Sequence, residues 1–147
     1  MDKKIKGVQV TRLEIFKDNK GSILHMIKKN SKVFKSFGEI YFSTINPGII
    51  KGWNLHKKMT INLVCIKGKV KIVLYDDRKN SKTFKRINEF ELSREKYFLL
   101  TIPPKIWCGF KNLHKGETIL ANCASIQHSA GEMKKISNED KLIPYKW

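Results

Sequence analysis

The fold of this chain is decided by the stretch Ile61-Asn62-Leu63-Val64-Cys65-Ile66-Lys67-Gly68-Lys69-Val70-Lys71-Ile72-Val73-Leu74-Tyr75. Its first part, Ile61–Ile66, is almost entirely apolar, which is typical of a central strand covered on both faces. Its second part, Val70–Tyr75, begins with strict apolar and polar alternation, which indicates a strand with one buried face. The Lys67-Gly68-Lys69 turn signal between them makes two consecutive strands the expected structure.

The same pattern extends over the whole chain, because short β-branched and aromatic runs alternate with turn signals about every eight to twelve residues. We expect strands at Val8–Phe16, Ser22–Ile27, Gly38–Ile45, Ile49–Leu55, Thr60–Lys67, Lys69–Tyr75, Thr83–Leu92, Tyr97–Ile102, Trp107–Asn112 and Thr118–Ile126. The segment Ala130–Ile136 is expected to form one short helical turn, and the aromatic end Ile143–Trp147 to pack on the body. The prediction is an all-β jelly roll, with residues 1–147 forming a single domain.

Length and composition fit one domain with a real core, because the chain has 147 residues of which 41% are hydrophobic. No apolar stretch approaches the length of a transmembrane helix, so no membrane association is expected. The charged start Met1–Lys6 has no apolar segment behind it, which predicts a cytoplasmic protein. Cys65, Cys108 and Cys123 are scattered, and an odd number of such thiols fits a reducing compartment better than a disulfide framework.

The formal net charge of +17 raises the question of a nucleic-acid partner. Only four of the thirty basic residues are arginine, namely Arg12, Arg78, Arg86 and Arg94, and the lysines are spread along the chain. Base recognition and bidentate phosphate binding favour arginine. We therefore interpret the charge as a lysine-rich surface that would help to hold a small polyanion such as a nucleotide diphosphate, and we expect no nucleic-acid partner.

The histidines define one candidate for acid–base chemistry and no metal centre. His56 ends an extended segment beside a basic turn, so it is either a surface histidine or a general base at the rim of a barrel. A metal site needs three or four convergent ligands. The four histidines, which are His25, His56, His114 and His128, form no closely spaced pair, and Asn54 stands where a metal-binding cupin would place its first histidine.

Two further segments have the character of pocket walls. The Pro103-Pro104 pair and Gly109, which flank Trp107, indicate a rigid corner that is compatible with lining a pocket. The apolar run that begins at Ile119 changes abruptly into a polar loop that contains His128. That loop is either an ordinary surface loop or part of a site.

Taken in order, several segments resemble one family of sugar-nucleotide enzymes. They are Asp18-x-Lys20-Gly21, Leu55-His56, Leu63–Val70, Tyr75-Asp76-Asp77-Arg78 with Ser81-x-Thr83, Phe90-x-Leu92-Ser93, Ile102-Pro103-Pro104 with Gly109-Phe110, and Ile143–Trp147. The chain resembles the dTDP-4-dehydrorhamnose 3,5-epimerase family over residues 18–147. The resemblance implies a cupin-type jelly roll (a double-stranded β-helix), a homodimer without metal or cofactor, and a nucleotide-linked 4-keto-6-deoxy sugar as substrate.

The resemblance also implies roles for individual residues. His56 would be the base that removes a proton next to the ketone, Asp140 its carboxylate partner and His128 the proton donor. The residues expected to bind substrate are Lys20, His25, Trp53, Lys58, Asn62 and Trp107. The family's lysine would fall near Ile61 and its tyrosine near Ile126-Gln127, and this sequence has neither there.

These departures leave alternatives open. The first is a single-site epimerase, the second an enzyme that isomerises keto-sugars between C3 and C4, and the third a non-catalytic carbohydrate- or nucleotide-binding cupin. A nucleic-acid binder, which the net charge of +17 suggests, is the fourth alternative.

Overall fold

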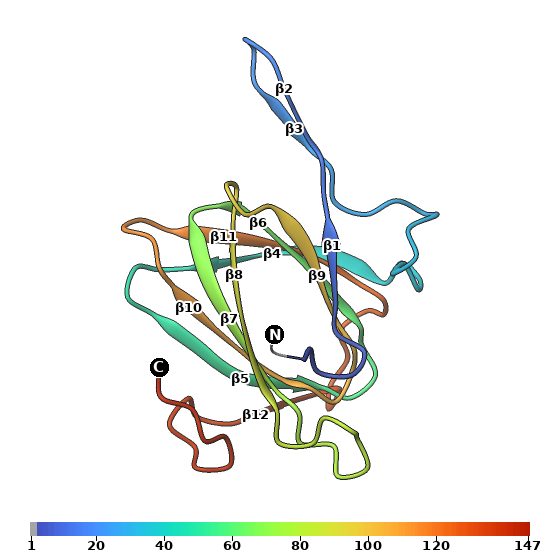
Figure 1. Cartoon of the computed structure of the whole chain (residues 1–147), viewed down its shortest axis with the longest axis vertical. Coiled ribbons are helices and arrows are strands. Elements are labelled where there is room, and N and C mark those ends of the chain that lie inside the picture. The colour runs from blue at the N-terminus through green and yellow to red at the C-terminus, as the bar shows by residue number, and fades with distance from the viewer. Residues whose placement is uncertain (1–2) are drawn as a thin grey trace.

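Two antiparallel five-stranded sheets face each other in the computed structural model, which describes residues 3–147 (Figure 1). Met1 and Asp2 of the predicted domain lie outside the described residues. The first sheet has the order β1-β9-β6-β11-β4 and the second β12-β5-β10-β7-β8. The strands are β1 (Gln9–Arg12), β4 (Glu39–Ile45), β5 (Ile50–His56), β6 (Ile61–Lys67), β7 (Lys69–Tyr75), β8 (Ile87–Ser93), β9 (Phe98–Ile102), β10 (Trp107–Asn112), β11 (Thr118–Ala124) and β12 (Met133–Lys135). From β4 to β11 the chain crosses from one sheet to the other at every connection except β7–β8, which are paired within the second sheet, and this order is that of a jelly roll. It confirms the predicted fold class.

A separate hairpin, formed by β2 (Ile15–Lys17) and β3 (Ser22–Leu24), projects away from the two sheets (Figure 1). The segment predicted as one strand, Val8–Phe16, is therefore divided between β1, which pairs with β9, and β2, which pairs only within the hairpin. Two other expectations are also corrected. Residues 76–86 form a loop before β8, so the start of the predicted Thr83–Leu92 strand, residues 83–86, is not a strand. The segment Ala130–Ile136 contains strand β12 in place of a helical turn.

The apolar strand β6 is buried on both faces, as its composition predicts. Ile61, Leu63 and Cys65 point into the core between the sheets, while Val64 packs with Leu99 on the outer face of the first sheet. The outer face of the second sheet is also covered, because the C-terminal segment packs Ile143, Tyr145 and Trp147 against it. This cover explains why β7, predicted to be half-buried, has Val73 and Tyr75 buried as well.

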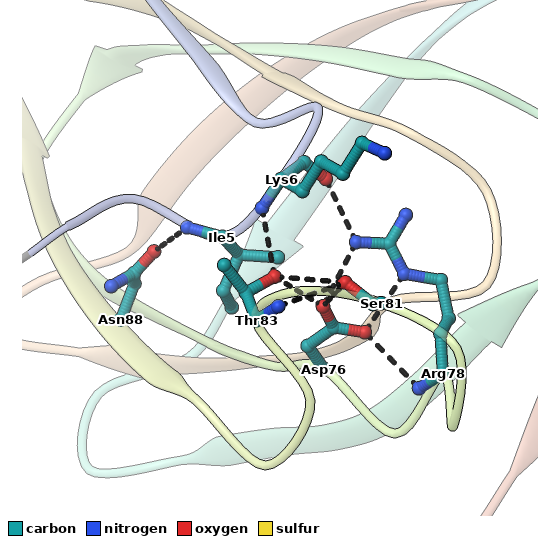
Figure 2. A network of polar contacts seen from close by, with 7 residues as sticks. All are labelled: Ile5, Lys6, Asp76, Arg78, Ser81, Thr83 and Asn88. Carbon is teal, nitrogen blue, oxygen red and sulfur yellow. Dashed lines mark hydrogen bonds and ion pairs between the residues drawn. The ribbon is translucent and has the colours of Figure 1, made fainter.

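A buried polar network fastens the N-terminal segment to the loop after β7 (Figure 2). Asp76 is completely buried and accepts hydrogen bonds from Arg78 Nε (2.8 Å), Ser81 Oγ (2.8 Å) and Thr83 Oγ1 (2.6 Å). The backbone of Lys6 joins the same network, since its N–H donates to Thr83 Oγ1 at 3.0 Å and its carbonyl accepts from Arg78 Nη2 at 2.8 Å. The Asp76–Arg78 motif therefore has a structural function.

Residues 3–147 contain no helix that could span a membrane.

Candidate active site

A cavity of about 480 Å³ opens between the two sheets on the side where β4 faces β5 and β12. Its wall on the first sheet consists of Tyr41, Ser43, Ile61, Leu63 and Leu120. Its wall on the second sheet consists of Ile50, Lys51, Gly52, Asn54, His56, Cys108, Phe110, Met133 and Lys135. Small-molecule sites are typically clefts of roughly 300–1,000 Å³ with an apolar lining and a few polar groups. The cavity meets that description.

His56 lies in this cavity at the end of β5. Side chains alternate along a strand, so Asn54 and His56 point into the cavity while Trp53 and Leu55 pack on the outer face of the sheet. The side chain of His56 is 14% exposed, and its Nδ1 lies 2.8 Å from Oε2 of Glu132. The structure therefore places a histidine with a carboxylate partner at a cavity wall.

Strand pairing brings Glu132 to this position. Glu132 immediately precedes β12, and Met133 of β12 is opposite His56 of β5 in the antiparallel register. The second carboxylate oxygen, Oε1, accepts the backbone N–H groups of Lys58 and Met59, each at 3.0 Å. Burial raises the pKa of Glu132, but the hydrogen bonds from His56, Lys58 and Met59 outweigh it and lower this pKa to about 2. Glu132 is thus a fixed carboxylate at neutral pH.

The ionised Glu132 determines which nitrogen of His56 is free. A carboxylate can only accept hydrogen bonds, so Nδ1 must carry the hydrogen at the 2.8 Å contact. In the neutral imidazole the other nitrogen, Nε2, then holds the lone pair. A histidine arranged in this way is a general base, and the carboxylate stabilises the imidazolium that forms when it takes a proton.

We expect Glu132→Gln to lower the turnover rate by about 10- to 100-fold, because the amide orients the ring less well and does not stabilise the imidazolium. Steady-state rates of the two purified proteins test this. Glu139→Gln, an exposed carboxylate in the C-terminal segment, is the matched control and should keep the wild-type rate. Equal rates for Glu132→Gln and the wild type would contradict the role of the pair.

The lowered pKa of Glu132 also predicts a pH-dependent stability. The folded state holds this carboxylate at a pKa of about 2, against an ordinary value of 4.5. Its contribution is therefore complete above pH 4.5 and is lost as the pH falls toward 2. Urea denaturation should accordingly show the wild type losing its stability advantage over Glu132→Gln between about pH 5 and pH 2. An advantage that stays constant over this range would contradict the assignment.

Two lysines and a tyrosine also line the cavity. Lys51 donates through Nζ to the carbonyl of Thr44 at 2.6 Å, and Lys135 of β12 lies on the same wall. Tyr41 of β4 lies on the opposite wall, where its hydroxyl accepts from Asn122 Nδ2 at 2.8 Å. Burial raises the pKa of the Tyr41 phenol, and this outweighs the opposite effect of the hydrogen bond from Asn122, so the phenol is protonated at neutral pH. The site thus combines a base, two cations and a phenol.

The structure separates the other two predicted catalytic residues from His56. The carboxylate that contacts His56 belongs to Glu132, whereas Asp140 uses Oδ1 to accept the N–H of Leu142 within an exposed turn. His128 is exposed, and its backbone N–H donates to Glu39 Oε1 at 3.2 Å. Neither residue is among those that line the cavity. The pairing of β12 with β5 is the reason, because it places Glu132 beside the imidazole ring of His56.

Three of the predicted substrate-binding residues are instead part of the packed interior. Trp53 is fully buried and stacks against Trp147, with ring centroids 5.0 Å apart, on the outer face of the second sheet. Trp107 belongs to the same outer cluster. Asn62 points away from the cavity, where its amide accepts from Thr101 Oγ1 at 2.7 Å and donates to the carbonyl of Cys123 at 3.1 Å. Strand alternation puts all three on faces that the cavity does not reach.

The remaining predicted substrate-binding residues are exposed at other places. Lys58 contributes its backbone N–H to Glu132, but its side chain lines a separate surface groove of about 550 Å³. Lys20 lies in the turn of the β2–β3 hairpin, and His25 follows β3 with its ring edge-on to Phe16 at 5.3 Å. Within one chain, then, the hairpin residues and His56 belong to different surfaces.

Glu132, Tyr41, Lys51 and Lys135 are the functional candidates that the sequence-based predictions do not include. Lys135 shares a face with Met133 because residues two apart on a strand point the same way, but this signal becomes usable only once β12 is known to pair with β5. No local sequence signal marks Tyr41, because its position at the cavity depends on β4 being the neighbour of β11. Among residues 3–147, no three His, Cys, Asp or Glu side chains converge on a common point suited to a metal ion.

A jelly roll with a histidine–carboxylate pair in a cavity between its sheets defines a class of enzymes that move protons on small molecules. The sequence matches the dTDP-4-dehydrorhamnose 3,5-epimerase family over residues 2–147. The chain belongs to this family of cupin-type epimerases.

Individual relatives agree with this membership. The crystal structure of a dTDP sugar isomerase from Desulfovibrio desulfuricans superposes with a TM-score of 0.95 at 36% identity, covering 97% of this chain and 92% of that one. The spore coat polysaccharide biosynthesis protein SpsL of Bacillus subtilis is 28% identical, covering 97% of this chain and 96% of its own length. The probable low-salt glycan biosynthesis epimerase Agl13 of Haloferax volcanii is 28% identical over 80% of this chain and 77% of its own length.

Proposed function

We propose that this protein epimerises a dTDP-linked 4-keto-6-deoxy sugar for the synthesis of a surface glycan or polysaccharide. The observation that carries the proposal is the His56–Glu132 pair, with Nδ1 and Oε2 2.8 Å apart, at the wall of a sugar-sized cavity. The membership of the family and the dTDP sugar isomerase at 36% identity support the substrate class. The related polysaccharide and glycan biosynthesis proteins support the pathway class.

The chemistry follows from the acidity of a C–H bond next to a ketone. Nε2 of His56 removes the proton, the C–H bond pair becomes the enolate double bond, and the ketone oxygen gains negative charge. This developing charge is the main cost of the step and needs positive groups already in place. Lys51 and Lys135 line the cavity and supply that charge in place of the lysine that is absent near Ile61.

Incubation with a dTDP-linked 4-keto-6-deoxy hexose in D₂O tests the proposal. We expect deuterium to enter the carbon next to the ketone and the product to show inverted configuration by NMR. Tight binding of the sugar nucleotide without deuterium uptake would favour the non-catalytic binding protein. Interconversion of the C3 and C4 oxidation levels would favour the keto-isomerase, and steeply salt-dependent binding of nucleic acid would favour the fourth alternative.

We further propose that the protein is a homodimer that joins through its exposed apolar surface. Phe16 and Ile23 of the projecting hairpin are 54% and 65% exposed, and Phe42 on the outer face of β4 is 64% exposed. Large apolar side chains that are exposed in this way mark a candidate interaction surface. Pairing two copies would cover it, and would let the hairpin residues Lys20 and His25 approach the cavity of a second copy.

Light scattering should therefore give twice the 17.1 kDa chain mass at micromolar concentration. Ile23→Asp should weaken dimerisation by about 30-fold, or about 2 kcal/mol, because it places a charge in the apolar interface. Leu113→Asp, at a 40% exposed leucine in the turn after β10, is the matched control and should leave the mass unchanged. A monomeric wild type would overturn the proposal.

A cytoplasmic location completes the proposed function. Cys65, Cys108 and Cys123 are all free and buried, and unpaired thiols of this kind fit a reducing compartment. The proposed substrate, a sugar nucleotide, would have to be present in the same compartment.

A further inference from the structure

We propose that Tyr41 on β4 is the second proton-transfer residue of this site, and that it returns a proton to the substrate carbon from the face opposite His56. This inference rests on the proposed epimerase function. It replaces the expected role of His128, which is exposed and does not line the cavity. It also assigns a donor to a chain that has no tyrosine near Ile126-Gln127.

The placement of Tyr41 is the first argument. His56 belongs to β5 in the second sheet and Tyr41 to β4 in the first, and both side chains line the same cavity. The two sheets form opposite walls of this cavity, so a flat enolate held between them presents one face to each. Of the chain's four tyrosines, all within the described residues, only Tyr41 lines the cavity.

The choice among the groups on that wall is the second argument. The first sheet contributes Tyr41, Ser43 and three aliphatic side chains to the cavity. A serine hydroxyl is far too weak an acid to donate a proton at neutral pH, whereas a phenol has an ordinary pKa of about 10. Lys135 and Cys108 belong to the wall that carries His56, so they cannot protonate the opposite face. The ammonium group of Lys51 does reach β4, but there it donates to the carbonyl of Thr44 at 2.6 Å and to Ser43 Oγ at 3.4 Å. Tyr41 is left as the proton donor.

The fixed orientation of the phenol is the third argument. Oδ1 of Asn122 accepts the backbone N–H of Asn62 at 3.0 Å, which leaves Nδ2 of the same amide to donate to the Tyr41 hydroxyl at 2.8 Å. Asn122 is only 1% exposed, so this amide cannot turn toward solvent. Because the phenol oxygen receives a hydrogen bond, its own hydrogen remains available to be donated into the cavity. Asn122 is a positioning residue in this arrangement.

The proposed step balances in protons and electrons. His56 Nε2 gains the proton from the sugar carbon, whose C–H electron pair enters the enolate. The enolate carbon then forms a new bond with the hydroxyl proton of Tyr41 on the other face, and the O–H pair stays on the phenolate oxygen. Proton exchange with water restores the phenol and the neutral imidazole, so no oxidant, reductant or co-reactant is needed.

The variant Tyr41→Phe separates the two proton transfers, because it keeps the ring and removes only the hydroxyl. In D₂O with the dTDP-linked 4-keto-6-deoxy hexose, we expect formation of the inverted product to fall by about 100-fold or more. Deuterium should still enter substrate that keeps its original configuration, since His56 remains. The affinity for dTDP should match the wild type, and the melting temperature should fall by only a few degrees, because Nδ2 of Asn122 loses its acceptor. Tyr145→Phe, which removes a phenol bonded to Glu89 outside the cavity, is the matched control and should invert at the wild-type rate.

Each other outcome has a distinct meaning. If Tyr41→Phe inverts its substrate as fast as the wild type, the assignment of Tyr41 is wrong while the epimerase function stands. If Tyr41→Phe loses deuterium exchange together with inversion, and still binds dTDP, the assignment of Tyr41 to the second transfer alone is wrong. If the wild type neither exchanges nor inverts, the proposed function itself fails.

Discussion

Replacing His56 with alanine should abolish epimerisation, with a loss of about 10³-fold or more in turnover. His56 is the one histidine that lines the cavity among the described residues, and its Nδ1 is held by Glu132 so that Nε2 can take the proton. General base catalysis by a positioned histidine contributes about 10² to 10⁴-fold, and here both deuterium uptake and inversion depend on it. In contrast to Tyr41→Phe, this variant should therefore show neither.

Two further variants keep the result interpretable. His56→Ala leaves the Glu132 carboxylate without one partner and is expected to cost about 1–3 kcal/mol of stability. His56→Gln retains an N–H donor but has no group that titrates near neutrality, so it tests the chemistry with less loss of stability. His128→Asn, which changes an exposed histidine, should keep the wild-type rate. A His56→Gln protein that retains more than about a tenth of the wild-type turnover would exclude His56 as the base.

Much of the fold is predictable because its strands carry strong periodic signals. Ile61–Ile66 is apolar throughout since both of its faces are covered, and the seven-residue strands β6 and β7 follow directly from their patterns. The three-residue strands β2, β3 and β12 are too short to show any period. Their pairing is determined by tertiary neighbours, which explains why Ala130–Ile136 was expected to form a turn of helix.

The candidate site is less predictable, because it is assembled from strands that are distant in the sequence. His56 is predicted at the end of its strand, but its partner Glu132 is 76 residues away and becomes a neighbour only when β12 pairs with β5. The position of Trp53, in contrast, can be derived from its own strand. Trp53 and His56 are three residues apart on a single strand, and alternation places such residues on opposite faces. The tryptophan is accordingly a packing residue.

The second large effect is expected at Asp76, where Asp76→Asn should lower the free energy of unfolding by about 3–5 kcal/mol. Asp76 is completely buried, and burial alone would raise its pKa. The hydrogen bonds from Arg78, Thr83 and Ser81 outweigh burial and hold this pKa far below its ordinary value, so the group is a buried carboxylate in the folded state. The asparagine leaves the Arg78 guanidinium without its counter-charge and turns an amide N–H toward groups that are already donors (Figure 2).

The loss of stability should extend to the N-terminal segment, because Thr83 and Arg78 also form hydrogen bonds with the backbone of Lys6. For a chain of this size, 3–5 kcal/mol corresponds to a fall of roughly 10 °C or more in melting temperature. Asp77→Asn is the matched control, since the neighbouring carboxylate lines an open groove, and it should melt within about 2 °C of the wild type. Thr83→Val removes hydrogen bonds but no charge and should fall between them. If Asp76→Asn melts together with Asp77→Asn, the network does not stabilise the fold, and the Tyr75-Asp76-Asp77-Arg78 motif must be explained by a role outside folding.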